Sequence, residues 1–183
     1  NWNYVSSVID VIGIELNSVL DGILSEIPFD FLFSDYGVLH FRRGDLLQYS
    51  NSMGVLEFDY FLKAVERAQP ADGKKTRLVV ISDDPVLATQ VFASSSFDIY
   101  GPEELSEWEA LAVMSRAKFV ITSNSTFSWW GGLLATINGG KAYIPDPWFL
   151  NWDPEPLDAF QYPGFTVLPS IFVKEPVRGD IGL

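Results

Sequence analysis

Short, mostly apolar runs recur along the chain, and each is followed by a polar cluster or turn and then by a segment with helical spacing or a tail. The runs lie at residues 38–41, 78–81, 97–100, 119–121 and 141–144. A strand that is apolar on both faces has to be covered on both, and its alternation with helices is typical of a parallel sheet between two helical layers. The sequence therefore predicts an α/β fold, a doubly wound parallel sheet of about five strands.

The segments with helical spacing are predicted helices at residues 57–68, 85–93, 103–116 and 126–137. Before them, residues 5–27 carry apolar side chains at the spacing of one helical face, interrupted by acidic residues. This pattern indicates an amphipathic helix rather than a membrane span. From Trp148 onward, proline, glycine and aromatic residues alternate without period, which predicts a wrapping tail with one extended piece at 165–168.

The composition excludes several classes of protein. The chain has 183 residues, of which 48% are hydrophobic, and this is enough apolar material to bury a core and to exclude disorder. Its net charge of −12 argues against nucleic-acid binding, which needs a basic surface. The lack of cysteine excludes disulfides and thiolate chemistry, and the single histidine excludes a zinc site made of several histidines.

Polar clusters follow four of the predicted strands. They are residues 42–45, 82–84, 122–125 and 145–146. The carboxyl ends of parallel strands lie at the same edge of a sheet, and ligands of such folds bind there. We therefore expect these clusters to converge on one binding site.

Two adjacent arginines, Arg42 and Arg43, follow the first strand of an acidic chain, with Asp45 close behind. A guanidinium donates two hydrogen bonds to phosphate oxygens and keeps its charge, so these residues are suited to a diphosphate. Neighbouring side chains of a strand point to opposite sides, which favours Arg42 over Arg43 as the ligand. The plainer interpretation is a surface ion pair with a nearby acid, in which Asp45 orients Arg42.

Ser123, Asn124, Ser125 and Thr126 stand at the predicted start of a helix. They are a seat for an anion, because the N–H groups of a first helical turn have no partner within the helix. The alternative is that they only cap the helix, as serine and asparagine commonly do. On the same edge as the arginines, they favour a diphosphate clamp.

Asp83 and Asp84 could recognise a base by accepting two N–H donors, as guanine offers, or hold a metal. Asp84 is also a good N-cap for a helix that begins at Pro85, so Asp83 is the better ligand candidate. No third metal ligand is signalled, and we expect no metal. His40 is either a satisfied core histidine or a further contact to the ligand, since it lies on the same strand face as Arg42.

These residues resemble the motifs of a known family. The run His40-Phe41-Arg42-Arg43-Gly44-Asp45 is similar to the first motif of the α-1,2- and α-1,6-fucosyltransferases and protein O-fucosyltransferases, and residues 81–85 resemble their second motif. Residues 123–131, SNSTFSWWG, resemble a segment of the α-1,2-fucosyltransferases, glycosyltransferase family 11. Three motifs in this order, within a similarity that covers about residues 37–150, are a specific signal.

The resemblance implies the C-terminal, donor-binding half of a GT-B-type glycosyltransferase, with a Rossmann-like sheet that holds GDP-fucose. It implies a metal-independent, inverting transfer of fucose to a glycan hydroxyl without a cofactor. An α-1,2 linkage and a galactoside-type acceptor are the favoured interpretation.

By carry-over, Arg42 is the catalytic residue, because it binds the β-phosphate and stabilises the leaving GDP. The residues implied in substrate binding are His40, Arg43, Asp45, Asp83, Asp84, Ser123, Asn124, Ser125, Thr126 and Phe127. Among them, His40 and the two neighbouring aspartates are placed by the guanine and ribose. Ser125, Thr126 and Phe127 are placed at the diphosphate.

The chain departs from the family pattern before His40, where the Gly-rich opening segment and the acceptor-side domain are not found, and at Leu46, where a tyrosine is usual. We therefore expect a fragment with three parts. Residues 1–35 form a helix that is a remnant of, or a link to, the acceptor-side domain. Residues 36–150 form the Rossmann-like GDP-fucose-binding domain, and residues 151–183 the wrapping tail.

Three functional hypotheses follow. The first is an α-1,2-fucosyltransferase, expected in the bacterial cytoplasm with peripheral membrane association, or in the Golgi lumen of a eukaryote. The second is a truncated donor domain that binds a GDP-sugar without activity of its own. The third is an unrelated phosphate-binding domain such as a receiver-like regulator. It ranks last because such a domain has an acidic pair early and a lysine late in its sequence, and this order is not found here.

Overall fold

The computed structural model describes residues 7–28, 30–33, 35–70, 76–92, 98–101, 103–151 and 160–174. Its strands are β1 (Tyr36–Phe41), β2 (Arg77–Ser82), β3 (Asp98–Tyr100), β4 (Phe119–Ile121), β5 (Lys141–Asp146) and β6 (Phe165–Pro169). They form one six-stranded sheet in the order β3-β2-β1-β4-β5-β6, and every neighbouring pair is parallel. The predicted α/β fold with a parallel sheet is confirmed.

The strand order reverses between β1 and β4. From β1 to β3, each strand lies on the same side of the one before it, whereas β4 lies on the other side of β1 and is followed outward by β5 and β6. In a parallel sheet all strands end at the same edge. At this reversal, the loops that follow β1 and β4 run toward opposite faces of the sheet. In folds of this kind, a crevice lies between two such loops. The fold therefore prepares a binding position at the carboxyl ends of these two strands.

The sheet has one strand more than the sequence predicts. β6 lies where only an isolated extended piece was expected, and it pairs with β5 from Ala142 opposite Phe165 to Asp146 opposite Pro169. Its residues are half-buried or exposed, because β6 is the last strand at one side of the sheet. An edge strand of this kind lacks the continuous apolar run that marks the inner strands, so its pairing was not visible in the sequence.

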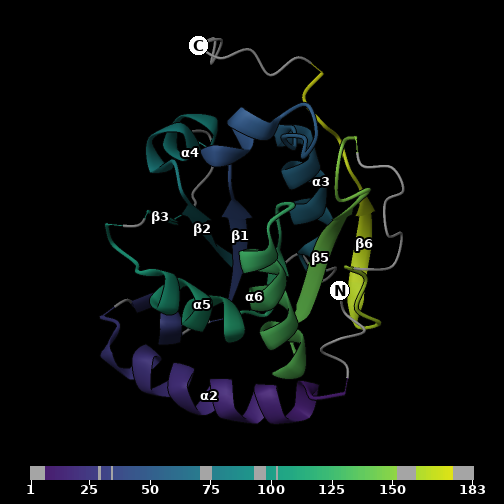
Figure 1. Cartoon of the computed structure of the whole chain (residues 1–183). Coiled ribbons are helices and arrows are strands. Elements are labelled where there is room, and N and C mark those ends of the chain that lie inside the picture. The colour runs from purple at the N-terminus through teal and green to yellow at the C-terminus, as the bar shows by residue number, and fades with distance from the viewer. Residues whose placement is uncertain are drawn as a thin grey trace.

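The helices are α2 (Ile9–Glu26), α3 (Phe58–Ala68), α4 (Pro85–Val91), α5 (Glu107–Ser115) and α6 (Thr126–Ile137). On one face of the sheet, α3 and α4 enclose a core that includes Phe41, Phe61 and Val80. On the other face, α5 and α6 pack against side chains such as Val79 and Val120. Figure 1 shows α2 as an outer layer, lying across the outside of α5 and α6.

The α5 helix begins at Glu107 rather than at residue 103 as the sequence predicts. The Ser106 hydroxyl accepts a hydrogen bond from the Glu109 N–H at 3.4 Å, and the Glu109 carboxylate accepts one from the Ser106 N–H at 2.8 Å. This reciprocal capping box fixes the first turn at Ser106. The residues before it form a turn in which the Glu104 carboxylate accepts the Gly101 N–H at 2.8 Å.

The predicted N-terminal helix is observed as α2, and the start of the predicted range, up to residue 6, lies outside the described residues. Of the apolar stripe, Leu20 and Ile27 are buried but Val19 is 56% exposed, because α2 packs against α5 and α6 through one side only. Within the described part of the chain, no helix is both long and apolar enough to cross a membrane.

Candidate functional site

A hollow of about 760 Å³, the main hollow, lies at the carboxyl edge of the sheet. Its lining consists of His40, Arg42, Asp45, Ile81, Ser82, Asp83, Gly101, Leu105, Ser106, Glu107 and Phe127. These residues come from the ends of β1, β2 and β3 and from the starts of α5 and α6. Clusters that lie far apart in the sequence thus meet at one edge, as expected.

A smaller hollow of about 160 Å³, the aromatic hollow, adjoins the main one, and Arg42 and Asp45 line both. Its other walls are Leu46, Met53, Asn124, Ser125, Thr126, Trp148, Phe149 and Phe160. The rings of Trp148 and Phe160 are stacked with centroids 4.4 Å apart. Sequence reasoning missed these aromatic side chains.

The fourth polar cluster, residues 145–146, is not among the residues that line either hollow. The Asp146 carboxylate instead accepts a hydrogen bond from the Gln161 amide at 3.5 Å. The signal for the aromatic hollow was the pair of residues just after this cluster, Trp148 and Phe149. Phe160 comes from the tail, where no local pattern marks it.

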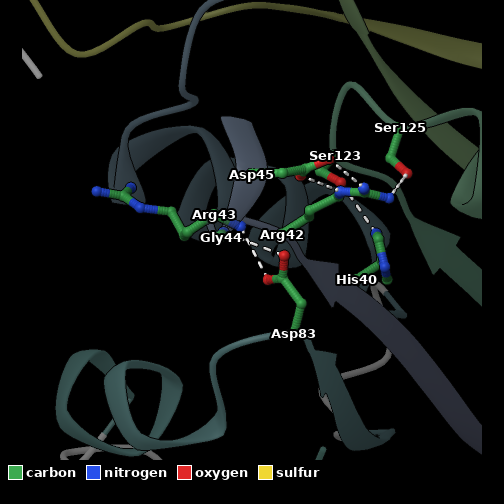
Figure 2. A network of polar contacts seen from close by, with 8 residues as sticks. All are labelled: His40, Arg42, Arg43, Gly44, Asp45, Asp83, Ser123 and Ser125. Atoms are coloured by element: carbon green, nitrogen blue, oxygen red, sulfur yellow. Dashed lines mark hydrogen bonds and ion pairs between the residues drawn. The ribbon is translucent and has the colours of Figure 1, made fainter. Parts of the chain in front are cut away.

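The Arg42 guanidinium is held in place from two sides. Its Nε and one terminal nitrogen donate to the two oxygens of Asp45 at 3.0 and 2.7 Å, and its other terminal nitrogen donates to the Ser125 hydroxyl at 3.3 Å. This link between the loops after β1 and β4 spans the reversal of strand order (Figure 2). The hydrogen bond to Arg42 lowers the pKa of Asp45, and the same contact raises the pKa of Arg42, so both groups stay charged.

The Asp83 carboxylate shapes the turn that carries Arg42. Its two oxygens accept the backbone N–H groups of Arg43 and Gly44, each at 3.0 Å. A Cβ at residue 44 would lie 2.7 Å from one of these oxygens, so a larger residue there would displace the carboxylate from this turn. Asp83 also lines the main hollow, but both of its oxygens are already engaged by the turn.

His40 is buried at the floor of the main hollow, 5% exposed. Its Nδ1 lies 2.9 Å from the Ser123 hydroxyl, and its ring lies 5.6 Å from the Phe127 ring, centroid to centroid. Burial, with a smaller contribution from Arg42, lowers the pKa of His40 to about 3. The imidazole is therefore neutral, and it combines both interpretations of the sequence, a satisfied core histidine that also faces the hollow.

The polar side chains before α6 make contacts other than a helix cap. The Asn124 amide donates to the carbonyl oxygens of Met53 and Gly54 at 3.0 and 3.1 Å, which fixes the segment to a neighbouring loop. The Ser125 side chain makes no capping hydrogen bond and accepts from Arg42 instead. Thr126 begins the helix and lines the aromatic hollow. The first turn of α6 thus faces the same position as the Arg42 guanidinium.

Two predicted ligands have structural roles instead. The Arg43 side chain extends away from Arg42 (Figure 2), donates to the Leu56 carbonyl at 3.0 Å and lies over the Phe41 ring. Asp84 caps α4 by accepting the Leu87 N–H at 2.9 Å, as the sequence suggested. Neither residue is among those that line the two hollows. Both arginines follow the end of β1 at Phe41, and their side chains leave this turn in different directions, so only Arg42 reaches the hollows.

This arrangement is suited to an anion. One fixed guanidinium, a buried serine hydroxyl and the first turn of a helix converge where Arg42 meets Ser125. Among the described residues, no group of three histidine, aspartate or glutamate side chains could hold a metal ion. An oriented guanidinium together with hydroxyl and N–H donors has the chemistry to bind phosphate oxygens and to stabilise negative charge on them.

Comparison with known proteins agrees with this chemistry. The family model described as Glycosyl transferase family 11 matches residues 9–149. The chain is 34% identical over 116 residues to the O-antigen biosynthesis glycosyltransferase WbnK of Escherichia coli, a match that covers 61% of this chain and 38% of that protein. It is 28% identical over 121 residues to an alpha-1,2-colitosyltransferase of Escherichia coli, covering 61% of this chain and 40% of the relative.

Among solved structures, the chain is similar to the glycosyl transferase family 9 protein from Veillonella parvula DSM 2008, with a TM-score of 0.49 and 11% sequence identity. That match covers 88% of this chain and 42% of the other. The stretch matched in each of the two curated relatives is about two fifths of their length.

Proposed function

Because the chain belongs to glycosyl transferase family 11, we propose that it binds the nucleotide-sugar donor GDP-fucose and transfers fucose to a hydroxyl of a glycan, with inversion and in α-1,2 linkage. The observation that carries this proposal is the contact between Arg42 and Ser125 at the reversal of strand order. In doubly wound sheets this is the position at which nucleotides bind.

The diphosphate is placed where the two hollows meet. Arg42 is proposed to bind the β-phosphate, because its guanidinium lines both hollows and is already oriented by Asp45. Ser125 and Thr126 supply hydroxyl and N–H groups on the opposite side. A phosphate between them would be held by charge and by fixed donors together.

The nucleoside fits the main hollow. The lining of this hollow extends from Arg42 past His40 and Phe127 to Gly101, just after β3. The neutral imidazole of His40 offers a polar contact without adding charge. The fucose is placed in the smaller aromatic hollow, whose walls include Trp148 and Phe149.

In the transfer step the acceptor oxygen attacks C1 of fucose from the face opposite to GDP. The bond between C1 and the β-phosphate oxygen breaks, and its electron pair leaves with GDP. Arg42 stabilises the charge that develops on the phosphate, so no metal is needed for this task. The acceptor hydroxyl loses its proton late, to water or to the leaving GDP, as an oxocarbenium-like sugar forms. A galactoside-type glycan is the proposed acceptor.

Two other candidates rest on specific observations. One is a donor-binding unit that holds the GDP-sugar and transfers nothing alone, and the stretch matched in the two curated relatives is about two fifths of their length. A relative is named an alpha-1,2-colitosyltransferase, which makes colitose a second candidate for the transferred sugar. Both candidates use the same phosphate contacts.

A thermal unfolding series with GDP in the presence of EDTA tests the proposal. At about 100 times Kd, GDP should add about 2.7 kcal/mol to the free energy of unfolding and raise Tm by several degrees. An unchanged Tm at millimolar GDP contradicts all three candidates. Incubation with GDP-fucose and a lactose-type acceptor then separates them, because binding without transfer supports the donor-binding unit.

A further inference from the structure

The far end of the main hollow, opposite Arg42, is formed by Gly101, Leu105, Ser106 and Glu107. With the diphosphate at Arg42, the length of a nucleoside diphosphate places its base at this end. The base would therefore lie beside the first residues of α5. Which base the protein accepts depends on the hydrogen-bonding groups available there.

The carboxylates around this part of the hollow are already engaged, with one exception. Asp45 is paired with Arg42, and Asp83 accepts two backbone N–H groups. Glu104 accepts the Gly101 N–H, and Glu109 accepts the N–H and hydroxyl of Ser106. Glu107 lines the hollow, and no hydrogen bond or ion pair joins its carboxylate to another described residue.

Asp83 and Asp84 were the sequence-based candidates for reading guanine. Asp84 is an N-cap outside the hollow lining, and both oxygens of Asp83 hold the turn after β1. A carboxylate that gave up two backbone N–H groups to bind a base would leave those groups unpaired, at a cost. Recognition of the base by a carboxylate would therefore require a different acidic residue.

We propose that Glu107 recognises guanine by accepting the N1–H and the exocyclic N2–H of the base with its two oxygens. This inference rests on the proposed binding of a GDP-sugar. A carboxylate only accepts hydrogen bonds, and the Watson–Crick edge of guanine presents two adjacent donors to it. Adenine has an acceptor at N1 and would face the carboxylate with like partners, so Glu107 selects against it.

The proposal predicts a direction for the change in GDP affinity on Glu107→Gln. That direction is opposite to the one expected if Glu107 did not contact the base. Glu107 is exposed, and its negative charge alone weakens the binding of any anionic nucleotide to a small extent. If Glu107 made no contact with the base, Glu107→Gln would leave GDP binding unchanged or make it tighter. A carboxylate that accepts two hydrogen bonds from guanine predicts the opposite, weaker GDP binding.

The test is calorimetric titration of the chain with GDP, IDP and ADP, where IDP lacks the exocyclic amine. For the unmodified chain we expect GDP to bind about tenfold more tightly than IDP and more tightly still than ADP. Glu107→Gln should weaken GDP about tenfold and bring GDP and IDP to similar affinities. Glu103→Gln removes the same charge from an exposed residue outside the hollow lining and should change none of the three.

The outcomes separate the two proposals. If GDP binds and Glu107→Gln behaves like Glu103→Gln, the assignment of Glu107 is wrong while the proposed function stands. If the unmodified chain binds no GDP, the proposed function fails and the assignment fails with it. Far-UV circular dichroism and Tm test whether both variants are folded. We expect both to be folded, because neither residue is buried.

Discussion

Two hollows of nearly equal size lie at opposite edges of the sheet. The main hollow at the carboxyl edge measures about 760 Å³, and a second one at the amino edge, the amino-edge hollow, measures about 720 Å³. The amino-edge hollow is lined by Arg67, Lys118 and Lys141, so it holds more cationic side chains than the main hollow. Because the two volumes are nearly equal, the number of cationic side chains alone would make the amino-edge hollow the better anion site.

The difference lies in how the cations are held. Arg42 is 32% exposed and makes three hydrogen bonds to Asp45 and Ser125. Lys118 is 60% exposed and makes a single contact with Asp35 at 3.2 Å, and no ion pair joins Arg67 or Lys141 to another described residue. An oriented guanidinium binds phosphate without losing side-chain freedom, whereas a mobile lysine loses it on binding. Fixed geometry therefore distinguishes a site from a charged surface.

The largest expected effect is that of Arg42→Ala. Loss of the guanidinium should weaken GDP binding about 100-fold, because two charge-assisted hydrogen bonds to phosphate are removed. Lys118→Ala, which removes the same charge at the amino edge, should change the Kd less than about twofold. Calorimetric titration measures both. Equal losses in the two variants would show that net charge, and not the orientation of Arg42, determines binding.

Asp83→Ala is expected to have the next largest effect. It leaves the N–H groups of Arg43 and Gly44 without their acceptor, and we expect the free energy of unfolding to fall by about 2 kcal/mol. Asp35→Ala at the amino edge removes only an exposed ion pair and should cost less than about 0.5 kcal/mol. Urea unfolding measures both changes. A smaller loss for Asp83 than for Asp35 would contradict its role in shaping the turn.

Local sequence predicted the features that depend on single elements. The apolar runs predicted the inner strands β1, β2, β4 and β5. The sequence favoured Arg42 over Arg43, and the Arg43 side chain does point elsewhere, although both residues lie in the turn after β1 rather than in the strand. The order of Asp84 and Pro85 predicted the start of α4. Each of these follows from residues within one turn or one strand.

Specific contacts between distant residues were missed, although the convergence of the polar clusters was predicted. The engagement of Asp83 by the turn after β1 joins residues about 40 positions apart, and the aromatic hollow takes Phe160 from the tail. The strand β6 has no apolar run of its own and is defined by its pairing with β5. The start of α5 was a different kind of error, because Ser106 and Glu109 already formed a recognisable capping box in the sequence.

The buried histidine predicts a pH dependence that is specific to the carboxyl edge. The folded chain holds the pKa of His40 at about 3, while an unfolded chain has about 6.5. Between these values the unfolded state binds a proton that the folded state does not, so stability falls as pH falls below about 6.5. At pH 5.5 the loss relative to pH 7.5 should be about 1.4 kcal/mol.

His40→Asn tests this pH dependence, because asparagine does not titrate and its amide can still reach the Ser123 hydroxyl. Urea unfolding at pH 7.5 and 5.5 should show that the variant lacks the loss found in the unmodified chain. Asp35→Asn, at the amino edge, should retain the loss. If His40→Asn loses as much stability as the unmodified chain, the histidine is not held neutral in the folded state.

The smallest expected effect is that of Ser125→Ala, and it separates binding from capping. The Ser125 hydroxyl accepts one hydrogen bond from Arg42 at 3.3 Å and makes no capping bond. GDP should bind about threefold more weakly to the variant, while the free energy of unfolding changes by less than about 0.5 kcal/mol.

Ser106→Ala is the control for capping, because Ser106 is the N-cap of α5 and its side chain makes the capping bond. This variant should lower the free energy of unfolding by about 1 kcal/mol. If Ser125→Ala destabilises the chain as much as Ser106→Ala does, the hydroxyl serves the helix and not the ligand. Thr166→Ala, at the amino-edge hollow, should leave GDP binding unchanged, because Thr166 lines the hollow at the opposite edge of the sheet from the proposed phosphate position.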